Sequence, residues 1–545
     1  MSSALTELAE EFWCWRASTQ PESYDDLTRI ERPQDWTGDW SADAVAARRR
    51  RLSAFAERHR RLDLSAEPVA VQVDGRLIRS ALSRVRWELD LLRGWQRNPC
   101  FYIDQALIPV FNLLLAPPPF DDRRVQAIVR QLIATPILFA QARDNLAGHA
   151  AAPFARYAMR LLDRADEDLT TAMHALAAML PPEPAQRLLA AAFAAARALA
   201  AFRDWLGELL ESFGQDTSVG ASSFAYFLHR VALLPYPVQQ LRTMGRQETD
   251  RAITVEAVLR RRFTGRLRPG LIADAAEQIA RQHQDELAVR RFYTERGLLS
   301  QPEALRHYRF APIPPYLAPL SWLGIPDDLT SPQRRDDDAV RYIPRPGPAL
   351  PYFEYAKALD PLTAIVHEGA HAQQLALSWR HADPIRRHYY DSAPNEGIAF
   401  YNEELMLTSG LFDDAPASIA FIANAQRLRA LRVEIDIGLA LGDLTLDQAA
   451  DRLADAVPMD RQTAWQGAAF FAGNPGQGLS YQIGKLQITE LLADSVRDLG
   501  DAFDLRAFHD RLWREGNVPL VLQRWELLGR RGRLDDADRL ATEAR

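Results

Sequence analysis

The sequence predicts a mainly α-helical protein with a few short strands close to one long helix. Apolar residues recur every three or four positions over long stretches, as in residues 74–96, which is the spacing of an amphipathic helix. Nine prolines lie between Pro302 and Pro351 and leave little room for helix there. The chain of 545 residues is long enough to bury a large core.

Helices are predicted for most of the N-terminal part of the chain. The helix expected at 74–96 is stopped by Asn98 and Pro99, and the helix expected at 101–115 is stopped by a run of three prolines at 117–119. The alanine-rich residues 189–201 favour helix by intrinsic propensity. The expected helices cover residues 74–96, 101–115, 122–145, 154–179 and 184–213.

A polar, glycine-bearing segment at residues 214–223 marks the best candidate for a domain boundary. It divides the chain into an N-terminal helical region, 1–213, and a catalytic helical region, 214–545. We expect the two regions to form one continuous structural unit. In the second region, short strands are predicted at 341–343 and 352–354, directly before the helix that carries the main motif.

This helix carries the most specific motif in the chain. Asp360 is a good N-cap, and Pro361 suits the first helical position. Because residues four apart share one helix face, the imidazoles of His367 and His371 are expected side by side, with Glu368 next to them. This is the H-E-x-x-H pattern, in which two histidines bind zinc and the glutamate acts on a metal-bound water. A pair of ordinary helix histidines is the alternative interpretation.

A catalytic zinc requires a third protein ligand. The next helix, expected to be capped by Asn395 and to end at Gly410, opens with Glu396, 25 residues after His371. Glu396 is therefore the predicted third ligand, although an acid in a first turn can also simply face the helix dipole. Glu403 lies two turns further along the same face and is predicted to accept a hydrogen bond from a ligand histidine.

The composition is that of a soluble globular protein, with 47% apolar and 25% charged residues. A net charge of −7 gives no basic field for nucleic acid or an anionic membrane. Only two cysteines, Cys14 and Cys100, are present, which favours a reducing compartment. The N-terminus is acidic and lacks the features of a signal peptide, and the most apolar helix, 188–210, contains Arg197 and Arg203. We therefore expect a cytoplasmic protein that binds neither nucleic acid nor membrane.

The chain resembles the bacterial DUF885 family along essentially its whole length. The resemblance is carried by Asn98-Pro99 with Tyr102, by the metal helix, and by residues 136–146, 231–245, 396–401, 475–484 and 508–520. Members of this family are predicted zinc metallopeptidases of mainly helical, gluzincin-like build. Family members usually carry an insertion with Pro-Gly between the glutamate and the second histidine. The compact motif of this chain, residues 367–371, is instead similar to the thimet-oligopeptidase-like and carboxypeptidase-Taq-like clans.

The resemblance implies a zinc-dependent hydrolase, a metallopeptidase with one Zn²⁺ per chain bound by His367, His371 and Glu396. Glu368 is the expected general base that activates the metal-bound water. Tyr481, in a glycine-bearing segment, is the candidate donor to the oxyanion of a tetrahedral intermediate. A tyrosine that packs between helices is the alternative for this position.

Further residues are candidates for binding the substrate, which we expect to be a peptide or an amide-containing small molecule. His388, Tyr389 and Tyr390 lie on the loop between the two ligand helices, where they could equally anchor that loop. Lys485 and Arg386 are candidates for receiving a substrate carboxylate.

Other classes of function stay open at this point. Glu368 and His371 also form one Glu-x-x-His motif, the spacing found in di-iron proteins, but no convincing second copy of the motif is present. A non-catalytic peptide-binding scaffold would have no chemical need for the complete His-Glu-His-Glu set. Hydrolysis of an amide bond in small-molecule biosynthesis cannot be separated from peptidase action by the sequence.

Overall fold

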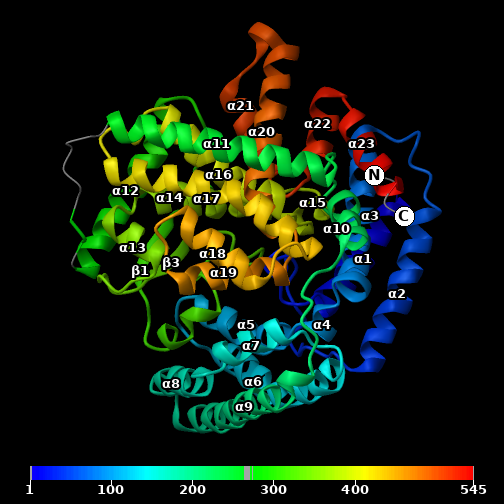
Figure 1. Cartoon of the computed structure of the whole chain (residues 1–545), viewed down its shortest axis with the longest axis vertical. Helices are drawn as coiled ribbons and strands as arrows, with labels where there is room; N and C mark the ends of the chain where they lie inside the picture. Colours follow the sequence, from blue (N-terminus) through cyan, green and yellow to red (C-terminus); the bar gives the residue numbers. More distant parts are fainter. Residues whose placement is uncertain (1–2, 263–269, 273, 544–545) are drawn as a thin grey trace.

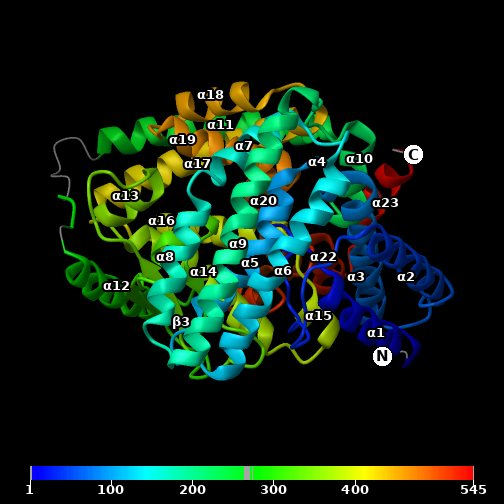
Figure 2. The same ribbon diagram turned by 90° about the horizontal axis from the view of Figure 1, so that it is seen from below.

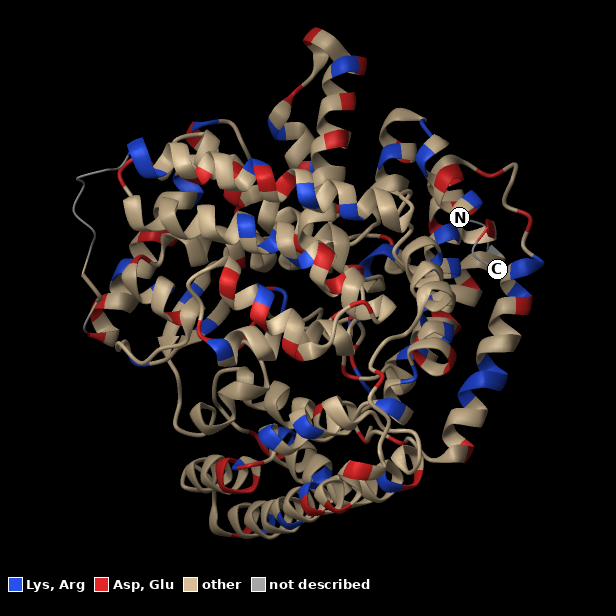
Figure 3. Cartoon of the chain, viewed as in Figure 1, with Lys and Arg blue, Asp and Glu red and all other residues tan. Residues whose placement is uncertain are grey.

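Helices make up most of the computed structural model, which describes residues 3–262, 270–272 and 274–543 (Figure 1). The mainly α-helical class predicted from the sequence is confirmed. Acidic and basic residues are interspersed over the helices (Figure 3). The charges therefore do not separate into one strongly basic or acidic face in this view.

The N-terminal helices pack around a large apolar cluster, and α5, α6, α8 and α9 lie at one end of the molecule (Figure 1), side by side in the view from below (Figure 2). The predicted helix at 74–96 is interrupted, because a π-helical turn and the left-handed residue Arg93, with φ of 52°, separate α3 from α4. The elements are α1 (Ser3–Thr19), α2 (Ala42–Arg60), α3 (Val69–Arg86), the π-helical turn η1 (Trp87–Leu92), α4 (Gly94–Arg97), α5 (Pro99–Leu115), α6 (Asp122–Leu146), α7 (Ala152–Leu161), α8 (Ala165–Ala177), α9 (Pro182–Leu209) and the 3-10 turn η2 (Leu210–Ser212).

This apolar cluster continues beyond residue 213. Leu317, Tyr342 and Trp525 are buried in the same cluster as the N-terminal helices. The chain on the two sides of the expected boundary thus shares packed side chains, as one continuous unit would. The division at 213/214 itself stays a prediction.

A small three-stranded sheet lies, in the chain, before the helix that carries the H-E-x-x-H motif. Its order is β1-β3-β2, with β1 (Tyr308–Pro312) parallel to β3 (Ala339–Ile343) and β2 (Asp327–Asp328) antiparallel to β3. The strand predicted at 341–343 is confirmed as part of β3. A 3-10 turn, η4 (Ala318–Leu323), lies between β1 and β2.

The strand predicted at 352–354 is wrong, because these residues open helix α13 (Tyr352–Leu359). Pro351, in an extended conformation, forms the N-cap, and the aromatic rings of Tyr352 and Phe353 pack against Phe421 of α17 (Pro416–Leu441). Aromatic residues suggested a strand, but their packing partner is a helix.

The other helices fill the rest of the chain. Helices α14, α16, α17 and α20 pack against one another in the middle of the molecule and carry most of the candidate site. The elements are α10 (Ala221–Tyr226), the π-helical turn η3 (Phe227–Val231), α11 (Val238–Arg262), α12 (Ala275–Glu295), α14 (Leu362–Trp379), α15 (Pro384–His388), α16 (Ser392–Thr408), α17 (Pro416–Leu441), α18 (Leu446–Ala456), α19 (Arg461–Gly473), α20 (Gln477–Leu499), the 3-10 turn η5 (Gly500–Ala502), α21 (Leu505–Arg514), α22 (Leu520–Leu528) and α23 (Gly532–Glu543).

Two helical stretches, Asp122–Leu146 and Pro182–Ser212, are long and apolar enough to cross a bilayer by length and composition alone. Within the molecule, 44% and 39% of their most apolar windows are buried against other elements. Core helices of soluble proteins pass the same test, so the two stretches carry little weight as evidence for a membrane span.

Candidate metal centre

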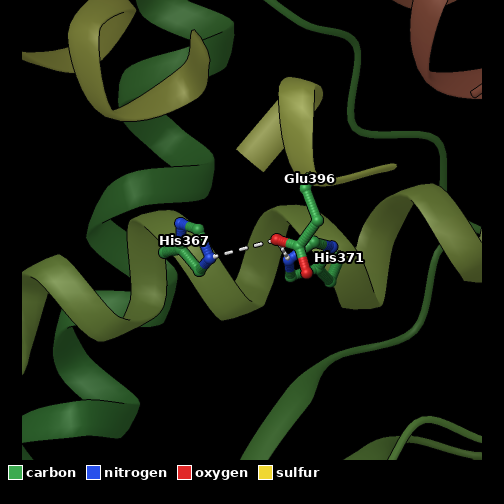
Figure 4. A group of neighbouring side chains, drawn as sticks. All are labelled: His367, His371 and Glu396. Atoms are coloured by element: carbon green, nitrogen blue, oxygen red, sulfur yellow. Dashed lines mark ion pairs between the residues drawn. The ribbon is translucent and has the colours of Figure 1, made fainter. Parts of the chain in front are cut away.

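Helix α14 places the two histidines of the motif on one face. The side chain of Asp360 accepts a hydrogen bond from the backbone N–H of Leu362, where the helix begins, so Pro361 lies one position before the helix and not inside it. The ring centroids of His367 and His371 are 5.1 Å apart. Both rings face the same side of the helix, as the four-residue spacing requires (Figure 4).

Helix α16 brings Glu396 to these histidines. The helix is capped by Asp391, whose side chain accepts a hydrogen bond from Ala393, and it therefore begins before the predicted cap Asn395. The Oε2 atom of Glu396 lies 3.4 Å from Nε2 of His371 and 3.9 Å from Nε2 of His367 (Figure 4).

The three side chains fit a single metal ion. One ligand atom from each lies within 4.8 Å of the others. Ligands at the corners of a zinc tetrahedron are roughly 3.3 Å apart, since each bond is about 2.0–2.1 Å long. In addition, Oε2 of Glu396 is buried and accepts no hydrogen bond from the described residues, which leaves a buried acceptor without a partner. We refer to His367, His371 and Glu396 as the trio.

The charges of the trio stabilise one another without a metal. Burial would raise the pKa of Glu396, but the neighbouring imidazoles outweigh it and the pKa is lowered. Burial lowers the pKa of His371, yet the Glu396 carboxylate raises it above its usual value. A cation at this position would compete with protons for the same atoms.

Glu403 contacts the far side of His367. Its Oε1 lies 2.7 Å from Nδ1 of His367, and Nη1 of Arg429 lies 2.9 Å from the same carboxylate. A carboxylate beside Nδ1 holds the imidazole proton on that nitrogen. The lone pair of Nε2 then faces the other two residues of the trio. Burial would raise the pKa of Glu403, but Arg429 and His367 lower it, so the carboxylate is ionised.

Glu368 lies beside the trio and contacts two cations. Its Oε1 is 3.4 Å from Nη1 of Arg341 on β3 and 3.6 Å from Nζ of Lys357 on α13. Burial would raise the pKa of Glu368, but Arg341 and Lys357 lower it well below its usual range. Arg341 is 1% exposed and also pairs with Asp327 at 3.0 Å.

Tyr481 reaches the trio from α20. The start of this helix is fixed by Asp436, whose carboxylate accepts hydrogen bonds from the backbone N–H groups of Gly476 and Leu479. The Tyr481 phenol and the Glu396 carboxylate lie close enough to shift each other's pKa. Burial and the Glu396 carboxylate raise the pKa of the phenol well above its usual value, so the hydroxyl stays a donor.

The structure places only one of the predicted loop residues near the trio. The hydroxyl of Tyr390 donates to Asn395, and the neighbouring Glu396 is among the groups that raise its pKa. Tyr389 hydrogen-bonds with Ser80 of α3. His388 contacts the backbone oxygen of Arg29 and packs near the ring of Trp13. These two residues attach the loop to the N-terminal helices.

The two cations predicted to receive a substrate carboxylate are already matched by acids. Lys485 is 2% exposed and pairs with Glu404 at 2.8 Å and Glu248 at 3.3 Å. Arg386 is also buried and contacts three carboxylates: Asp74 of α3, Glu515 in the turn between α21 and α22, and Glu526 of α22.

Sequence reasoning missed four cations around the site, namely Arg341, Lys357, Arg429 and Arg432. They come from β3, from α13, which directly precedes the motif helix, and from α17, and no fixed spacing relates them to the motif. Lys357 is one of only two lysines in this arginine-rich chain, and this rarity was the only signal in the sequence for any of the four cations. In the described part of the chain, the trio is the single group of three metal-ligating residues, and a di-iron site would need more carboxylates.

Two solved structures share the fold of this chain over nearly its whole length. One, a "putative lipoprotein of unknown function" from Shewanella oneidensis, has a TM-score of 0.70 at 15% identity and covers 96% of this chain and 99% of its own. The other, a "putative lipoprotein" from Colwellia psychrerythraea, has a TM-score of 0.73 at 15% identity and covers 99% and 98%. A structure described as a "putative oligoendopeptidase F" from Bacillus anthracis str. Ames was also matched, at 12% identity over 95% of this chain and 97% of its own. Its TM-score of 0.32 is too low to show a shared fold.

These structures correct one expectation. Both full-length neighbours are described as lipoproteins, a class of membrane-anchored or secreted proteins, and this finding overturns the cytoplasmic location expected from the sequence. No curated protein sequence matches the chain. Residues 24–302 and 333–526 match the family described as "Bacterial protein of unknown function (DUF885)", and the chain therefore belongs to the DUF885 family.

Proposed function

We propose that this protein is a zinc-dependent hydrolase that cleaves peptide or other amide bonds. One observation carries the proposal: two imidazole Nε2 atoms and a buried carboxylate oxygen without a hydrogen-bond partner converge beside a second carboxylate, that of Glu368. Two histidines and one acid are the ligand set of the His₂Glu class of catalytic zinc sites.

His367, His371 and Glu396 would hold the ion, and Glu403 would keep His367 in the tautomer that binds it. Bound zinc supplies a water of lowered pKa, about 7, and polarises the carbonyl under attack. Glu368 would accept a proton from the attacking water and return it to the leaving amine. Arg341 and Lys357 keep this carboxylate ionised and fix its position.

Tyr481 would stabilise the oxyanion that forms on the substrate. Its hydroxyl is a donor next to Glu396, and its helix is anchored by the hydrogen bonds from Gly476 and Leu479 to Asp436. A donor held in place before the reaction stabilises developing negative charge more effectively than one that must reorganise.

The first test is the metal content of protein purified without added metal. We expect about one zinc per chain in the wild type. Glu396→Gln should lose most of it, because Gln offers a neutral and weaker ligand. Glu404→Gln is the matched control, since Glu404 lies on the same helix but pairs with Lys485 and Arg251. Full zinc in Glu396→Gln, or two irons in the wild type, would contradict the proposed site.

The second test is turnover on a peptide library, read by mass spectrometry. Glu368→Gln should keep its zinc and lose activity by about a hundredfold or more, the usual range for a general base. Undiminished activity in this variant would remove Glu368 from its role. If zinc-loaded wild type cleaves neither peptides nor simple amides, the hydrolase proposal itself fails.

A further inference from the structure

Arg432 lies beside the trio without an acid to match its charge. It is partly buried on α17, and its Nε atom is inaccessible and has no hydrogen-bond partner among the described residues. Within that part of the chain, no carboxylate lies within 4.0 Å of its guanidinium nitrogens. The group instead stacks near two aromatic rings, those of Phe471 and Tyr481, each 5.2 Å from its central carbon.

The other cations near the site are matched. Arg429 pairs with Glu403, and Lys485 pairs with Glu404. A buried or half-buried guanidinium normally has a carboxylate partner, because removing an unpaired charge from water is costly. Arg432 is thus a cation that can accept an anionic partner from outside the described side chains.

The position of Arg432 relates it directly to the reaction. Tyr481 lies close to both Glu396 and Arg432: the Arg432 guanidinium carbon is 5.2 Å from the centre of its ring, and the Glu396 carboxylate raises the pKa of its phenol. A substrate carbonyl held at the trio is therefore separated from the guanidinium by one side chain. In a peptide, the carboxylate of a C-terminal residue follows the preceding carbonyl carbon by about three covalent bonds, a comparable reach.

We propose that Arg432 binds a carboxylate of the substrate close to the bond that is cleaved. The inference rests on the proposed function and specifies its substrate class: peptides with a free C-terminal carboxylate or an acidic side chain next to the scissile bond. Guanidinium is suited to this task, because its planar N–H groups match the two oxygens of a carboxylate.

The experiment uses paired peptides on the zinc-loaded full chain. One pair differs only in a C-terminal acid or amide, and a second pair differs only in Glu or Gln beside the scissile bond. We expect the wild type to favour the acidic member of one pair, by about 10- to 100-fold in kcat/KM, as for a hydrogen bond to a charged group. The pair that shows this preference identifies the source of the carboxylate.

Arg432→Gln should lose this preference by slowing the acidic peptide while leaving the neutral peptide nearly unchanged. Arg432→Lys should keep part of it. Arg427→Gln is the matched control, because Arg427 lies on the same helix but pairs with Glu256 at 3.0 Å. It should leave the acid-to-neutral ratio at its wild-type value.

Calorimetric binding of the same peptides, with and without zinc, gives a readout independent of turnover. Acid-selective binding that is lost in Arg432→Gln supports the inference even if no peptide is hydrolysed. Hydrolysis without any acid preference overturns the inference and leaves the hydrolase proposal standing. An equal loss on acidic and neutral peptides in Arg432→Gln also overturns it, since Arg432 would then act only through Tyr481.

Discussion

At the scale of single residues, the site is a set of alternating charges around two imidazoles. His367 lies between Glu396 on its Nε2 side and Glu403 on its Nδ1 side, and Glu403 in turn pairs with Arg429. Each carboxylate fixes the direction of a neighbouring group. The direction in which His367 would bind a metal therefore depends on a residue that would not touch the metal.

Replacing Glu403 by Gln tests this dependence. We expect zinc affinity, measured by competition with a chelating dye, to fall about 10- to 100-fold, because the amide holds the Nδ1 proton of His367 less firmly. Glu404→Gln changes the neighbouring residue, which faces Lys485, and should keep wild-type affinity. Equal affinity in the two variants would show that Glu403 does not orient the ligand.

At the scale of helices, Glu396 and Tyr481 meet because α16 and α20 touch backbone to backbone. A β-carbon on Gly397 would lie 2.7 Å from the backbone of Gly484, and one on Gly484 would overlap the carbonyl oxygen of Ala393. Glycine inside a helix costs about 1 kcal/mol relative to alanine. The two glycines make the close approach of the ligand helix and the tyrosine helix possible.

Gly484→Ala should therefore separate α16 from α20. We expect a loss of about 1–3 kcal/mol in the free energy of unfolding by urea, as for an overpacked core, together with weaker zinc binding. Gly467→Ala on α19 is the control, since its β-carbon would meet only ordinary contacts, the nearest at 3.7 Å from Leu453. A stable Gly484→Ala protein with normal zinc content would contradict this account.

Local patterns predicted the parts of the site that lie on one helix face. The spacing of His367 and His371 depends only on helix geometry, and so does the spacing of Glu396 and Glu403. The cap of α16 was misplaced because Asp391 and Asn395 are both good N-caps, and only packing decides between them. The cations around the site depend on which helices become neighbours, and this information is not local.

At the scale of the whole molecule, buried ion pairs connect the N-terminal helices to the region of the site. Arg386, on α15 between helices α14 and α16, contacts Asp74 of α3 at 2.9 Å and Glu515 at 3.1 Å. His381 lies 3.3 Å from the same Glu515 carboxylate. Such contacts between distant segments could not be predicted from the sequence. The helical class could be predicted, because the spacing of apolar residues along the chain is enough to indicate it.

The pH dependence of the free energy of unfolding should show the contribution of the Glu515 carboxylate. Burial would raise its pKa, but His381 and Arg386 lower it from 4.5 to about 2. A carboxyl group with a lowered pKa in the folded state contributes stability above pH 4.5, and this contribution is lost as the pH falls towards 2.

Glu515→Gln should therefore destabilise the protein by about 1–3 kcal/mol at pH 7, and its difference from the wild type should shrink below pH 4.5. Urea unfolding at several pH values measures both. Glu57→Gln, which removes an exposed pair with Arg60, should leave the free energy of unfolding nearly unchanged. A difference for Glu515→Gln that is independent of pH would contradict the assignment.

The position of Tyr481, close to both Glu396 and Arg432, has a thermodynamic consequence. An ion at the trio and an anion at Arg432 would both lie next to this one side chain. Their affinities are then linked, and linkage is reciprocal: the factor by which the ion strengthens binding of the anion equals the factor by which the anion strengthens binding of the ion. A protein of this kind would hold its metal most tightly while it holds its substrate.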